Sequence, residues 1–259
     1  MSRSVGVVLP AYRPDVERLA RYVDDLHAAL DPDVIRVELD DAGPAIRDRI
    51  ADLPVTLHAV GGRRGKGAAV TCGFEALQTD VLAFADADGA TPAASIADVV
   101  APPCEGRADL AVGSRRHPEA DVRSHQTFAR RHLGDAFAWL ARRLLAVGLH
   151  DYQCGAKALT VETWDAVRVH LHEPGFAFDV ELVAMVGALG RRVVEVPVTW
   201  EDQPDSTVSG STVPALARAL VLSRHRAARL SGSRVHRLIP GTVGQGPRLI
   251  DRLASQHNE

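Results

Sequence analysis

The sequence predicts an α/β protein with a mixed, mostly parallel sheet and helices on both faces of that sheet. Short apolar runs alternate with helix-length amphipathic segments through the first half of the chain, and this alternation is typical of a parallel sheet. Polar loops follow the apolar runs, as expected where strands reach the edge of a sheet. With 259 residues, of which 46% are hydrophobic and 24% charged, the chain can bury the core of such a domain.

In the first half, strands are assigned to short apolar runs and helices to apolar residues at helical spacing. Val16, Leu19, Val23 and Leu26 recur at the spacing of one helix face. The run 81–85 is apolar throughout, as expected of a strand covered on both faces. The predicted strands are 5–9, 34–39, 55–59, 81–85 and 110–112, and the predicted helices are 15–30, 66–77 and one between the last two strands.

In the second half, we expect helices at 128–147, 179–189 and 214–230, and strands at 156–159 and 193–200, the latter with one exposed face. We assign residues 1–212 to the α/β domain and 213–259 to a basic amphipathic helix followed by a polar tail. Such a helix can lie on an anionic membrane surface. The alternative is a helix packed on the domain with its arginines in water.

Two carboxylates, Asp86 and Asp88, directly follow the buried run 81–85. At the carboxyl end of a parallel strand they would face the crevice in which open α/β sheets bind ligands. Two carboxylates there suit a hard divalent cation such as Mg²⁺, which binds one or two carboxylates together with substrate phosphates. The alternative is a turn that caps the next helix, because Asp, Gly and Thr all favour turns.

Three more polar loops follow predicted strands, at 10–13, 40–43 and 61–67. We expect all four loops to share one sheet edge, which is where nucleotides bind in such proteins. The glycine-rich loop 61–67 resembles a phosphate cradle, but no Ser or Thr follows Lys66, so it is not a P-loop. The alternative for this loop is a flexible turn that caps the next helix.

Seven segments, in order along residues 5–230, match the motifs of one known family. They are Pro10-Ala11-Tyr12, Asp40-Asp41, Gly65-Lys66-Gly67-Ala68-Ala69-Val70, Asp86-Ala87-Asp88-Gly89-Ala90-Thr91, Val112-Gly113-Ser114-Arg115, Asp151-Tyr152-Gln153-Cys154-Gly155-Ala156-Lys157 and Phe176-Ala177-Phe178-Asp179-Val180-Glu181-Leu182. In these segments the chain resembles glycosyltransferase family 2, the inverting enzymes with the Rossmann-like GT-A fold. Within that family it is most similar to the dolichyl-phosphate glucosyltransferases and mannosyltransferases, which implies a GT-A catalytic domain over residues 1–212.

The resemblance also implies roles for individual residues. Asp40 and Asp41 would grip the base of a nucleotide, and Arg115 would contact its diphosphate. The implied nucleotide site consists of Pro10, Ala11, Tyr12, Asp40, Asp41, Gly65, Lys66, Asp86, Ala87, Asp88 and Arg115, together with Arg130 or Arg131. The chain departs from the family where Arg13 and Pro14 replace the usual Asn-Glu, where Ala42-Gly43 replaces Gly-Ser, and where Asp205-Ser206-Thr207 lacks the usual lysine.

Transfer of a sugar from a nucleotide diphosphate gathers negative charge on the departing diphosphate, which Mg²⁺ or Mn²⁺ and nearby arginines stabilise. Asp88 is the first candidate ligand of the cation, while Asp86 would hold the ribose or a metal-bound water. Arg115 and Arg130, or its neighbour Arg131, are candidates for the diphosphate because planar guanidinium groups suit phosphate oxygens. The alternative for Arg130 and Arg131 is a solvated helix face.

The type of acceptor decides whether the site needs a base. A lipid monophosphate is largely dianionic at neutral pH and can attack unaided when cations hold it; Lys157 and Gln153 are the candidates for holding it. A hydroxyl acceptor must lose its proton, and Asp151 and Asp179 are the candidate bases. For Asp179 the alternative is a stabilising acidic residue at a helix N-terminus.

The main hypothesis is an inverting, metal-dependent transferase that moves a hexose, with glucose preferred, from a UDP-sugar to a polyprenyl or dolichyl phosphate at a membrane surface. The alternatives are transfer to a soluble hydroxyl acceptor and a non-catalytic partner that binds nucleotide sugars. The net charge of −3 gives no case for nucleic-acid binding. Three scattered cysteines and the lack of a spanning apolar run predict a cytoplasmic protein. The basic amphipathic helix adds that it can be peripheral on the inner face of the cell membrane.

Overall fold

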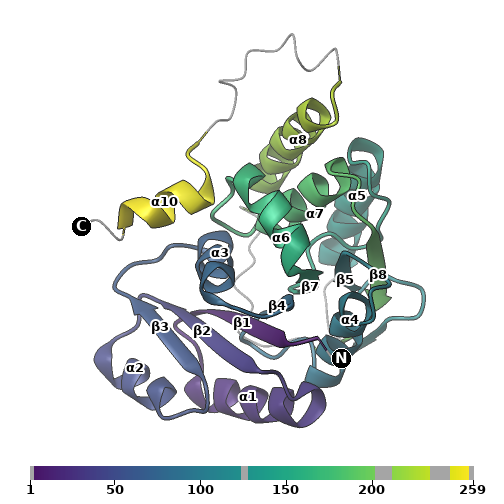
Figure 1. The fold of residues 1–259 in the computed structure, drawn as a ribbon. Coiled ribbons are helices and arrows are strands. Elements are labelled where there is room, and N and C mark those ends of the chain that lie inside the picture. The colour runs from purple at the N-terminus through teal and green to yellow at the C-terminus, as the bar shows by residue number, and fades with distance from the viewer. Residues whose placement is uncertain (1–2, 124–127, 202–211, 234–245, 257–259) are drawn as a thin grey trace.

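The computed structural model describes residues 3–123, 128–201, 212–233 and 246–256, without the side chains of 128–133, 212–214 and 254–256. Seven strands form one sheet between two layers of helices (Figure 1). The strands are β1 (Val5–Tyr12), β2 (Val34–Asp40), β3 (Thr56–Val60), β4 (Val81–Ala85), β5 (Leu110–Ser114), β7 (Ala156–Thr160) and β8 (Val193–Pro197). The predicted α/β class is therefore confirmed.

The strand order is β3-β2-β1-β4-β7-β5-β8. Neighbouring strands are parallel, except that β7 runs antiparallel to both β4 and β5. The carboxyl ends of the parallel strands therefore meet at one edge of the sheet. Because β7 runs the other way, the loop that enters it reaches the same edge. This single reversal brings residues of the second half beside the four loops of the first half.

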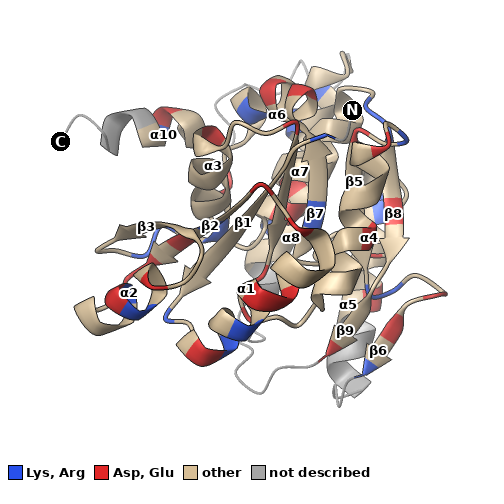
Figure 2. Cartoon of the chain, turned by 60° about the horizontal axis from the view of Figure 1, so that its bottom comes forward, with Lys and Arg blue, Asp and Glu red and all other residues tan. Residues whose placement is uncertain are grey.

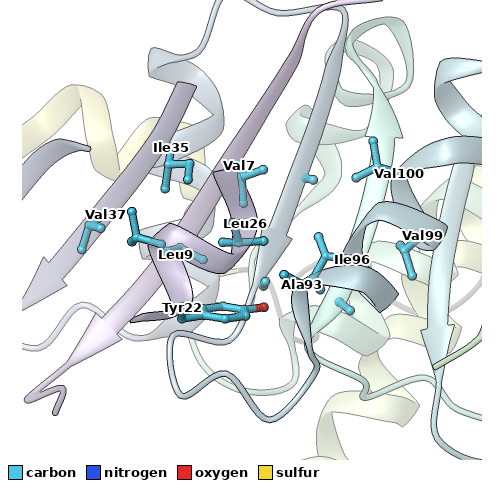
Figure 3. Packing of buried hydrophobic residues seen from close by; sticks show 14 of the residues in the cluster. Val7, Leu9, Tyr22, Leu26, Ile35, Val37, Ala93, Ile96, Val99 and Val100 are labelled. Atoms are coloured by element: carbon cyan, nitrogen blue, oxygen red, sulfur yellow. The ribbon is translucent and has the colours of Figure 1, made fainter. Parts of the chain in front are cut away.

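Two separate layers of apolar side chains fill the space between the sheet and its helices. On one face lie α1 (Val16–Leu30), α2 (Pro44–Ala51) and α4 (Ala93–Cys104); on the other lie α3 (Lys66–Ala76), α5 (Phe128–Leu144), α6 (Val161–Val167), α7 (Phe178–Ala188), α8 (Thr212–Leu230) and α10 (Leu249–Gln256). Successive residues of β1 alternate between these layers: Val7 and Leu9 pack with α1 and α4, as Figure 3 shows, and Val8 packs in the other layer.

Charged residues are rare in the strands at the middle of the sheet and common in the helices that cover it. Strand β1 contains none, whereas acidic and basic residues are found along the helices (Figure 2). Strand β7 is the exception in the middle of the sheet, because it carries one basic residue, Lys157, which is 1% exposed. A buried ammonium in a central strand needs a charged partner, and that partner lies in the site described below.

Three helices were not expected from the sequence. Helix α2 begins with Pro44 and buries only Ile50, so its apolar pattern is weak. Helix α6 is short and is capped by the Thr160 side chain, which accepts a hydrogen bond from the Thr163 N–H. Helix α10 lies within the predicted polar tail. It packs on α3 through buried Leu249, whose N–H donates to the Leu171 carbonyl.

The prediction of one strand over 193–200 is wrong. Strand β8 ends at Pro197, which has no N–H to continue a ladder. The chain then forms β9 (Thr199–Glu201), which pairs in parallel with β6 (Asp121–Arg123) in a separate two-stranded sheet. The residues of β8 are all partly exposed rather than alternating, because β8 is the edge strand.

Helix α8 packs against α7 in the layer that also holds α3 and α5. Leu220 and Ala227 are buried there, and Arg226 forms an ion pair with the buried Glu181 of α7. The opposite side is open to solvent: Val221 is 60% exposed, and Arg218 is exposed as well. Among the described residues, no helix is both long and apolar enough to cross a bilayer.

Candidate active site

The loops at the carboxyl edge of the sheet enclose a pocket of about 780 Å³. Its walls come from each of the four predicted loops and from the second half of the chain. The lining residues are Pro10, Ala11, Tyr12, Arg13, Pro14, Asp15, Arg18, Asp40, Arg63, Gly65, Lys66, Ala69, Asp86, Ala87, Asp88, Ala90, Arg115, Gln153, Phe176, Asp179, Trp200 and Leu216. The expectation that the loops after 5–9, 34–39, 55–59 and 81–85 share one edge is therefore met.

The acidic loop, residues 86–91, holds two carboxylates open to this pocket. The Asp88 side chain accepts a hydrogen bond from the Ala90 N–H at 3.0 Å. Tyr22 of α1 supports the loop from behind: its hydroxyl donates to the Thr91 carbonyl at 2.9 Å, and its ring lies against Gly89, whose φ is +68°. A side chain at position 89 would be strained in this backbone conformation, so the tight turn depends on glycine.

The donor atoms of the acidic loop fit a hard divalent cation. Both side chains offer carboxylate oxygens to the pocket, and the Asp86 side chain is 44% exposed. Asp88 is exposed at the pocket, but partial desolvation there and the nearby charge of Asp86 raise its pKa above the ordinary value. A dication between the two carboxylates would relieve that repulsion, which is why these residues suit Mg²⁺ or Mn²⁺.

Asp179 lies on the floor of the pocket between two lysines. It is the second residue of α7 and is 1% exposed. Its Oδ1 lies 2.7 Å from the Lys157 Nζ, and its Oδ2 lies 2.9 Å from the Lys66 Nζ. Burial alone would raise the pKa of this carboxyl, but the two ammonium groups lower it overall. Asp179 is therefore held as a paired carboxylate.

Lys157, the predicted contact to an acceptor phosphate, does not line the pocket. Its ammonium donates to the Cys154 carbonyl and to Asp179, both at 2.7 Å. The side chain is completely buried. The structure thus places Lys157 behind Asp179, whereas Gln153 and Lys66 line the pocket.

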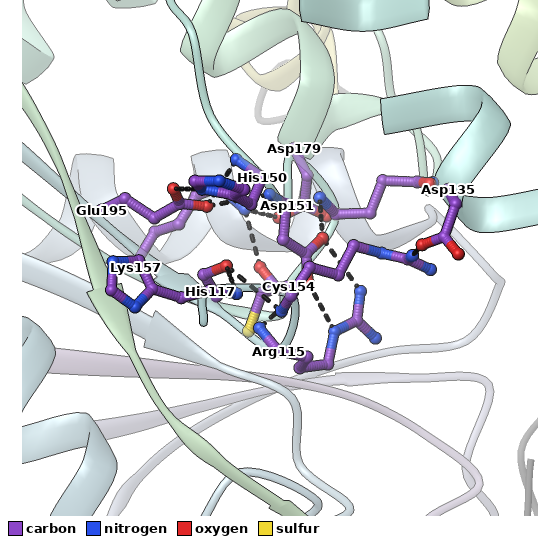
Figure 4. A network of polar contacts seen from close by, with 12 residues as sticks. Arg115, His117, Asp135, His150, Asp151, Cys154, Lys157, Asp179 and Glu195 are labelled. Atoms are coloured by element: carbon purple, nitrogen blue, oxygen red, sulfur yellow. Dashed lines mark hydrogen bonds and ion pairs between the residues drawn. The ribbon is translucent and has the colours of Figure 1, made fainter. Parts of the chain in front are cut away.

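Arg115 and Asp151 form a bidentate pair beside the pocket (Figure 4). Arg115 Nε and Nη2 donate to the two Asp151 oxygens at 2.7 and 3.1 Å, and the Gln153 N–H donates to Asp151 Oδ1 at 3.0 Å. Burial opposes ionisation of Asp151, yet the guanidinium keeps its pKa well below the ordinary value. Asp151 therefore orients Arg115, which lines the pocket, and is poorly suited to accept a proton.

Asp40 and Asp41 differ in their surroundings although they are adjacent. Asp40 is buried and accepts hydrogen bonds from the N–H groups of Arg64 and Gly65 and from Arg64 Nε. It anchors the loop 61–67 to the end of β2. Asp41 is more exposed and forms an ion pair with Arg13 at 2.8 Å. Asp40 lines the pocket, whereas Asp41, predicted for the same nucleotide site, is paired with Arg13 and is not among the lining residues.

Arg13 is the residue that departs from the family pattern, and the structure gives it defined contacts. Its guanidinium carbon lies 5.2 Å from the centre of the Tyr12 ring, while that of Arg63 lies 4.2 Å from the same ring. Arg13 and Asp41 both have positive φ, 46° and 48°, which is uncommon outside glycine and is often found at functional sites. Tyr12 is thus bordered by two cations at the mouth of the pocket.

Two of the four glycines in the loop 61–67, Gly65 and Gly67, are explained by close packing. A Cβ at Gly65 would lie 2.6 Å from the Pro174 carbonyl oxygen, and one at Gly67 would lie 2.2 Å from that of Glu173. The Ala68 N–H donates to the Pro174 carbonyl at 3.1 Å. The segment 173–175 therefore covers the start of α3, and this loop presents Lys66 to the pocket rather than an open cradle of backbone N–H groups.

Trp200 is a wall of the pocket that sequence reasoning missed. Its ring lies 5.7 Å from the Arg115 guanidinium carbon. Strand β9 is tied to the acidic loop because the Glu201 N–H donates to the Ala90 carbonyl at 2.8 Å. A signal existed, since Trp200 ends the predicted strand 193–200 and carboxyl ends carry sites. Arg18, Arg63 and Leu216 also line the pocket without having been singled out.

Two predicted residues, Arg130 and Arg131, lie outside the described side chains, although their backbone belongs to α5.

A separate cluster of possible metal ligands consists of Glu38 in β2, His58 in β3 and Cys72 in α3. The Glu38 carboxylate there is already paired with Arg36 at 2.7 Å and with Arg64 at 3.0 Å. These guanidinium groups disfavour a cation, so the cluster serves to hold Arg64 behind Asp40.

Comparison with known proteins decides the family. The family model for glycosyl transferase family 2 matches residues 7–154, which is more than half of the chain and includes the ends of β1, β2 and β4. The chain belongs to glycosyl transferase family 2. The match also extends through the loop that enters β7, so Asp86, Asp88, Arg115 and Asp151 all lie within the family domain.

Curated family 2 relatives cover different shares of the chain. Glycosyltransferase AglD of Haloferax volcanii is 33% identical over 216 residues, covering 79% of this chain and 34% of that protein. Dolichyl-phosphate beta-glucosyltransferase of Mus musculus is 34% identical and covers 54% of this chain and 44% of its own length. Undecaprenyl-phosphate mannosyltransferase of Micrococcus luteus is 30% identical, covering 81% and 89%. The chain thus spans less than half the length of the first two.

Solved structures support the GT-A fold of this family 2 chain. Glucosyl-3-phosphoglycerate synthase from Mycobacterium tuberculosis, crystallised with Mn²⁺, UDP and glucosyl-3-phosphoglycerate, aligns with a TM-score of 0.61. The alignment covers 89% of this chain and 80% of the synthase at 16% sequence identity. At this identity the likeness concerns the fold alone.

Proposed function

We propose that this chain is an inverting, metal-dependent hexosyltransferase that moves a sugar from a nucleoside diphosphate to a polyprenyl phosphate. One observation carries the choice of acceptor. Asp151 and Asp179, the two carboxylates suited by sequence to act as bases, are both held by cations. A phosphate acceptor is already ionised and needs no base, whereas a hydroxyl acceptor does.

The donor binds, in this proposal, along the rim formed by β1, β2 and β4. Tyr12 and Asp40 border the base, Asp86 and Asp88 hold Mg²⁺ or Mn²⁺, and Arg115 contacts the diphosphate. The cation supplies positive charge to the departing diphosphate. Support comes from the open carboxylates of the acidic loop and from a structural neighbour crystallised with Mn²⁺ and UDP. UDP-glucose is the first donor to test, because the relatives include dolichyl-phosphate glucosyltransferases.

The acceptor phosphate enters beside Gln153 and Lys66, and its prenyl chain leaves past Leu216 of α8. Helix α8 contains four arginines and no acidic residue. Arg218, Val221 and Arg229 are exposed on it, a composition that suits the surface of an anionic membrane. We place the protein as peripheral on such a surface, on the cytoplasmic side. The names of the relatives, which include an undecaprenyl-phosphate mannosyltransferase, support a lipid phosphate as acceptor.

The test is transfer of labelled sugar from UDP-glucose, UDP-galactose or GDP-mannose to a short polyprenyl phosphate, with Mn²⁺ and with a chelator. We expect lipid-linked product with one donor, loss of product with the chelator, and inversion at the anomeric carbon. Transfer to water-soluble hydroxyl acceptors instead would overturn the lipid-phosphate acceptor. Binding of UDP without turnover of any donor would favour a non-catalytic partner.

A further inference from the structure

Lysine is nearly absent from this chain, and the two that exist meet in the site. Of the 30 Lys and Arg residues, only Lys66 and Lys157 are lysines. They come from α3 and β7, which are remote in sequence, and both bind Asp179. The centre of the Phe84 ring lies near both ammonium groups, 5.2 Å from the Lys66 Nζ and 5.6 Å from the Lys157 Nζ.

The two ammonium groups have different freedom. Lys157 is fully buried and is satisfied by Asp179 and the Cys154 carbonyl. Lys66 is also nearly buried, with a side chain 7% exposed, but it lines the pocket. Its Nζ lies 2.9 Å from Asp179 Oδ2 and 2.9 Å from Asp86 Oδ1. Lys66 therefore joins the buried pair to the acidic loop.

Asp86 is held in place from the other side. Its N–H donates to the Gly155 carbonyl at 3.0 Å. A Cβ at Gly155 would lie 1.9 Å from Asp86 Oδ2, so the carboxylate rests directly on that glycine. With one oxygen against Gly155 and the other on Lys66, Asp86 has little room to turn. A cation that takes Asp86 as a ligand must therefore compete with the Lys66 ammonium.

The formal charges show how that competition affects the binding of an anionic ligand. Lys66 and Lys157 together carry two positive charges against the three negative charges of Asp86, Asp88 and Asp179. A dication changes the sign of this group from negative to positive. The group then favours a polyanion such as a nucleoside diphosphate. Lys66 would keep Asp179, which it shares with Lys157, and the anion would take the place of Asp86 beside its ammonium.

We propose that Lys66 is the internal counter-ion of the acidic loop: it neutralises Asp86 until a divalent cation replaces it there. This exchange weakens cation binding in the free protein and strengthens it when a diphosphate is present. Because such coupling is reciprocal, the cation raises the affinity for the diphosphate by the same factor. The inference rests on the proposed function for the identity of that diphosphate.

The first experiment measures Mn²⁺ binding to the full chain by electron paramagnetic resonance, without nucleotide. Lys66→Met removes the competing charge and is expected to bind Mn²⁺ about tenfold more tightly than the wild type. Lys66→Arg keeps the charge and stays near the wild type. Arg63→Met is the matched control, because it removes a cation of the same pocket that contacts Tyr12. It accounts for the general effect of one lost charge, expected to be under about threefold.

With UDP added, the wild type is expected to bind Mn²⁺ more tightly, and Lys66→Met to lose about tenfold of that enhancement. Equal Mn²⁺ affinity of Lys66→Met and Arg63→Met without nucleotide would overturn the proposal. If neither Mn²⁺ nor UDP binds the wild type, the proposed function fails as well. If both bind but Lys66→Met binds Mn²⁺ no more tightly than Arg63→Met does, the proposed function stands and this inference falls.

A second experiment uses the wild type and so does not depend on a variant that folds. Lysine labelled with ¹³C at Cε yields two side-chain NMR signals from the native sequence, and Lys66→Arg assigns them. Titration with Mg²⁺ in the absence of nucleotide is expected to shift the Lys66 signal and to leave that of Lys157 nearly unchanged. A Lys66 signal that stays in place at saturating Mg²⁺ would contradict the exchange.

Discussion

The acidic loop and the lysine pair are in direct contact, but their charges are arranged in opposite ways. In the acidic loop, residues 86–91, two carboxylates face the pocket, and the pKa of Asp88 is raised by confinement and by its neighbour Asp86. In the lysine pair, Lys66 and Lys157, each charge has a partner, and the pKa of the shared Asp179 is lowered. One region keeps like charges together at the surface; the other pairs opposite charges in the interior.

This difference indicates which region serves binding and which serves the fold. Carboxylates that repel one another destabilise the free protein slightly and become favourable only with a cation. Buried ion pairs contribute little net stability, but removing one partner leaves an uncompensated charge. Changes in the acidic loop should therefore abolish function and spare the fold, whereas loss of the completely buried Lys157 should damage the fold.

The largest effect is expected for Asp88→Asn. The amide keeps the shape of the side chain but loses the charge that a cation needs, so sugar transfer should fall by about 100- to 1,000-fold. In the presence of a chelator, the variant should unfold at the same temperature as the wild type or at a higher one. The reason is that the substitution removes a carboxylate charge that Asp86 repels. Retention of more than about a tenth of the transfer rate would contradict a metal role for this loop.

Next is Lys157→Met, which tests the other region. The variant leaves the Cys154 carbonyl without its donor and Asp179 with one cation instead of two. We expect a loss of about 3 kcal/mol in the free energy of unfolding, the usual size for breaking a buried pair. Urea denaturation measures it, with Arg63→Met at the exposed pocket mouth as a control expected to change little. A Lys157→Met protein as stable as that control would show that the buried pair is dispensable.

A smaller effect is expected where the two regions touch. Gly155→Ala places a methyl group 1.9 Å from Asp86 Oδ2 and must displace that carboxylate. We expect Mn²⁺ affinity to fall about tenfold, a loss of roughly 1.4 kcal/mol. Gly61→Ala is the control, because its Cβ would meet nothing within 4 Å. Equal Mn²⁺ binding by the two alanine variants would mean that Asp86 can move freely.

Much of the fold and half of the site followed from the sequence. The alternation of apolar runs and helices predicted the sheet, and the direction of parallel strands predicted that the loops after β1, β2, β3 and β4 would meet. The segments missed were those with weak patterns, such as α2 with its single buried Ile50 and β9 after Pro197. Trp200 was missed because the predicted strand 193–200 ran past Pro197, where β8 ends, so that Trp200 was counted as part of that strand.

What the sequence by itself determined is the pocket edge and its acidic loop, because Asp86 and Asp88 are set by a local rule: they follow a buried parallel strand. Only the tertiary structure decided which charges are free. Asp151 and Asp179 look alike as isolated acids, yet their partners lie 36 and 22 residues away, at Arg115 and Lys157. Whether two remote residues pair depends on how the strands and helices are brought together in space. The local sequence pattern does not show which remote residues become neighbours.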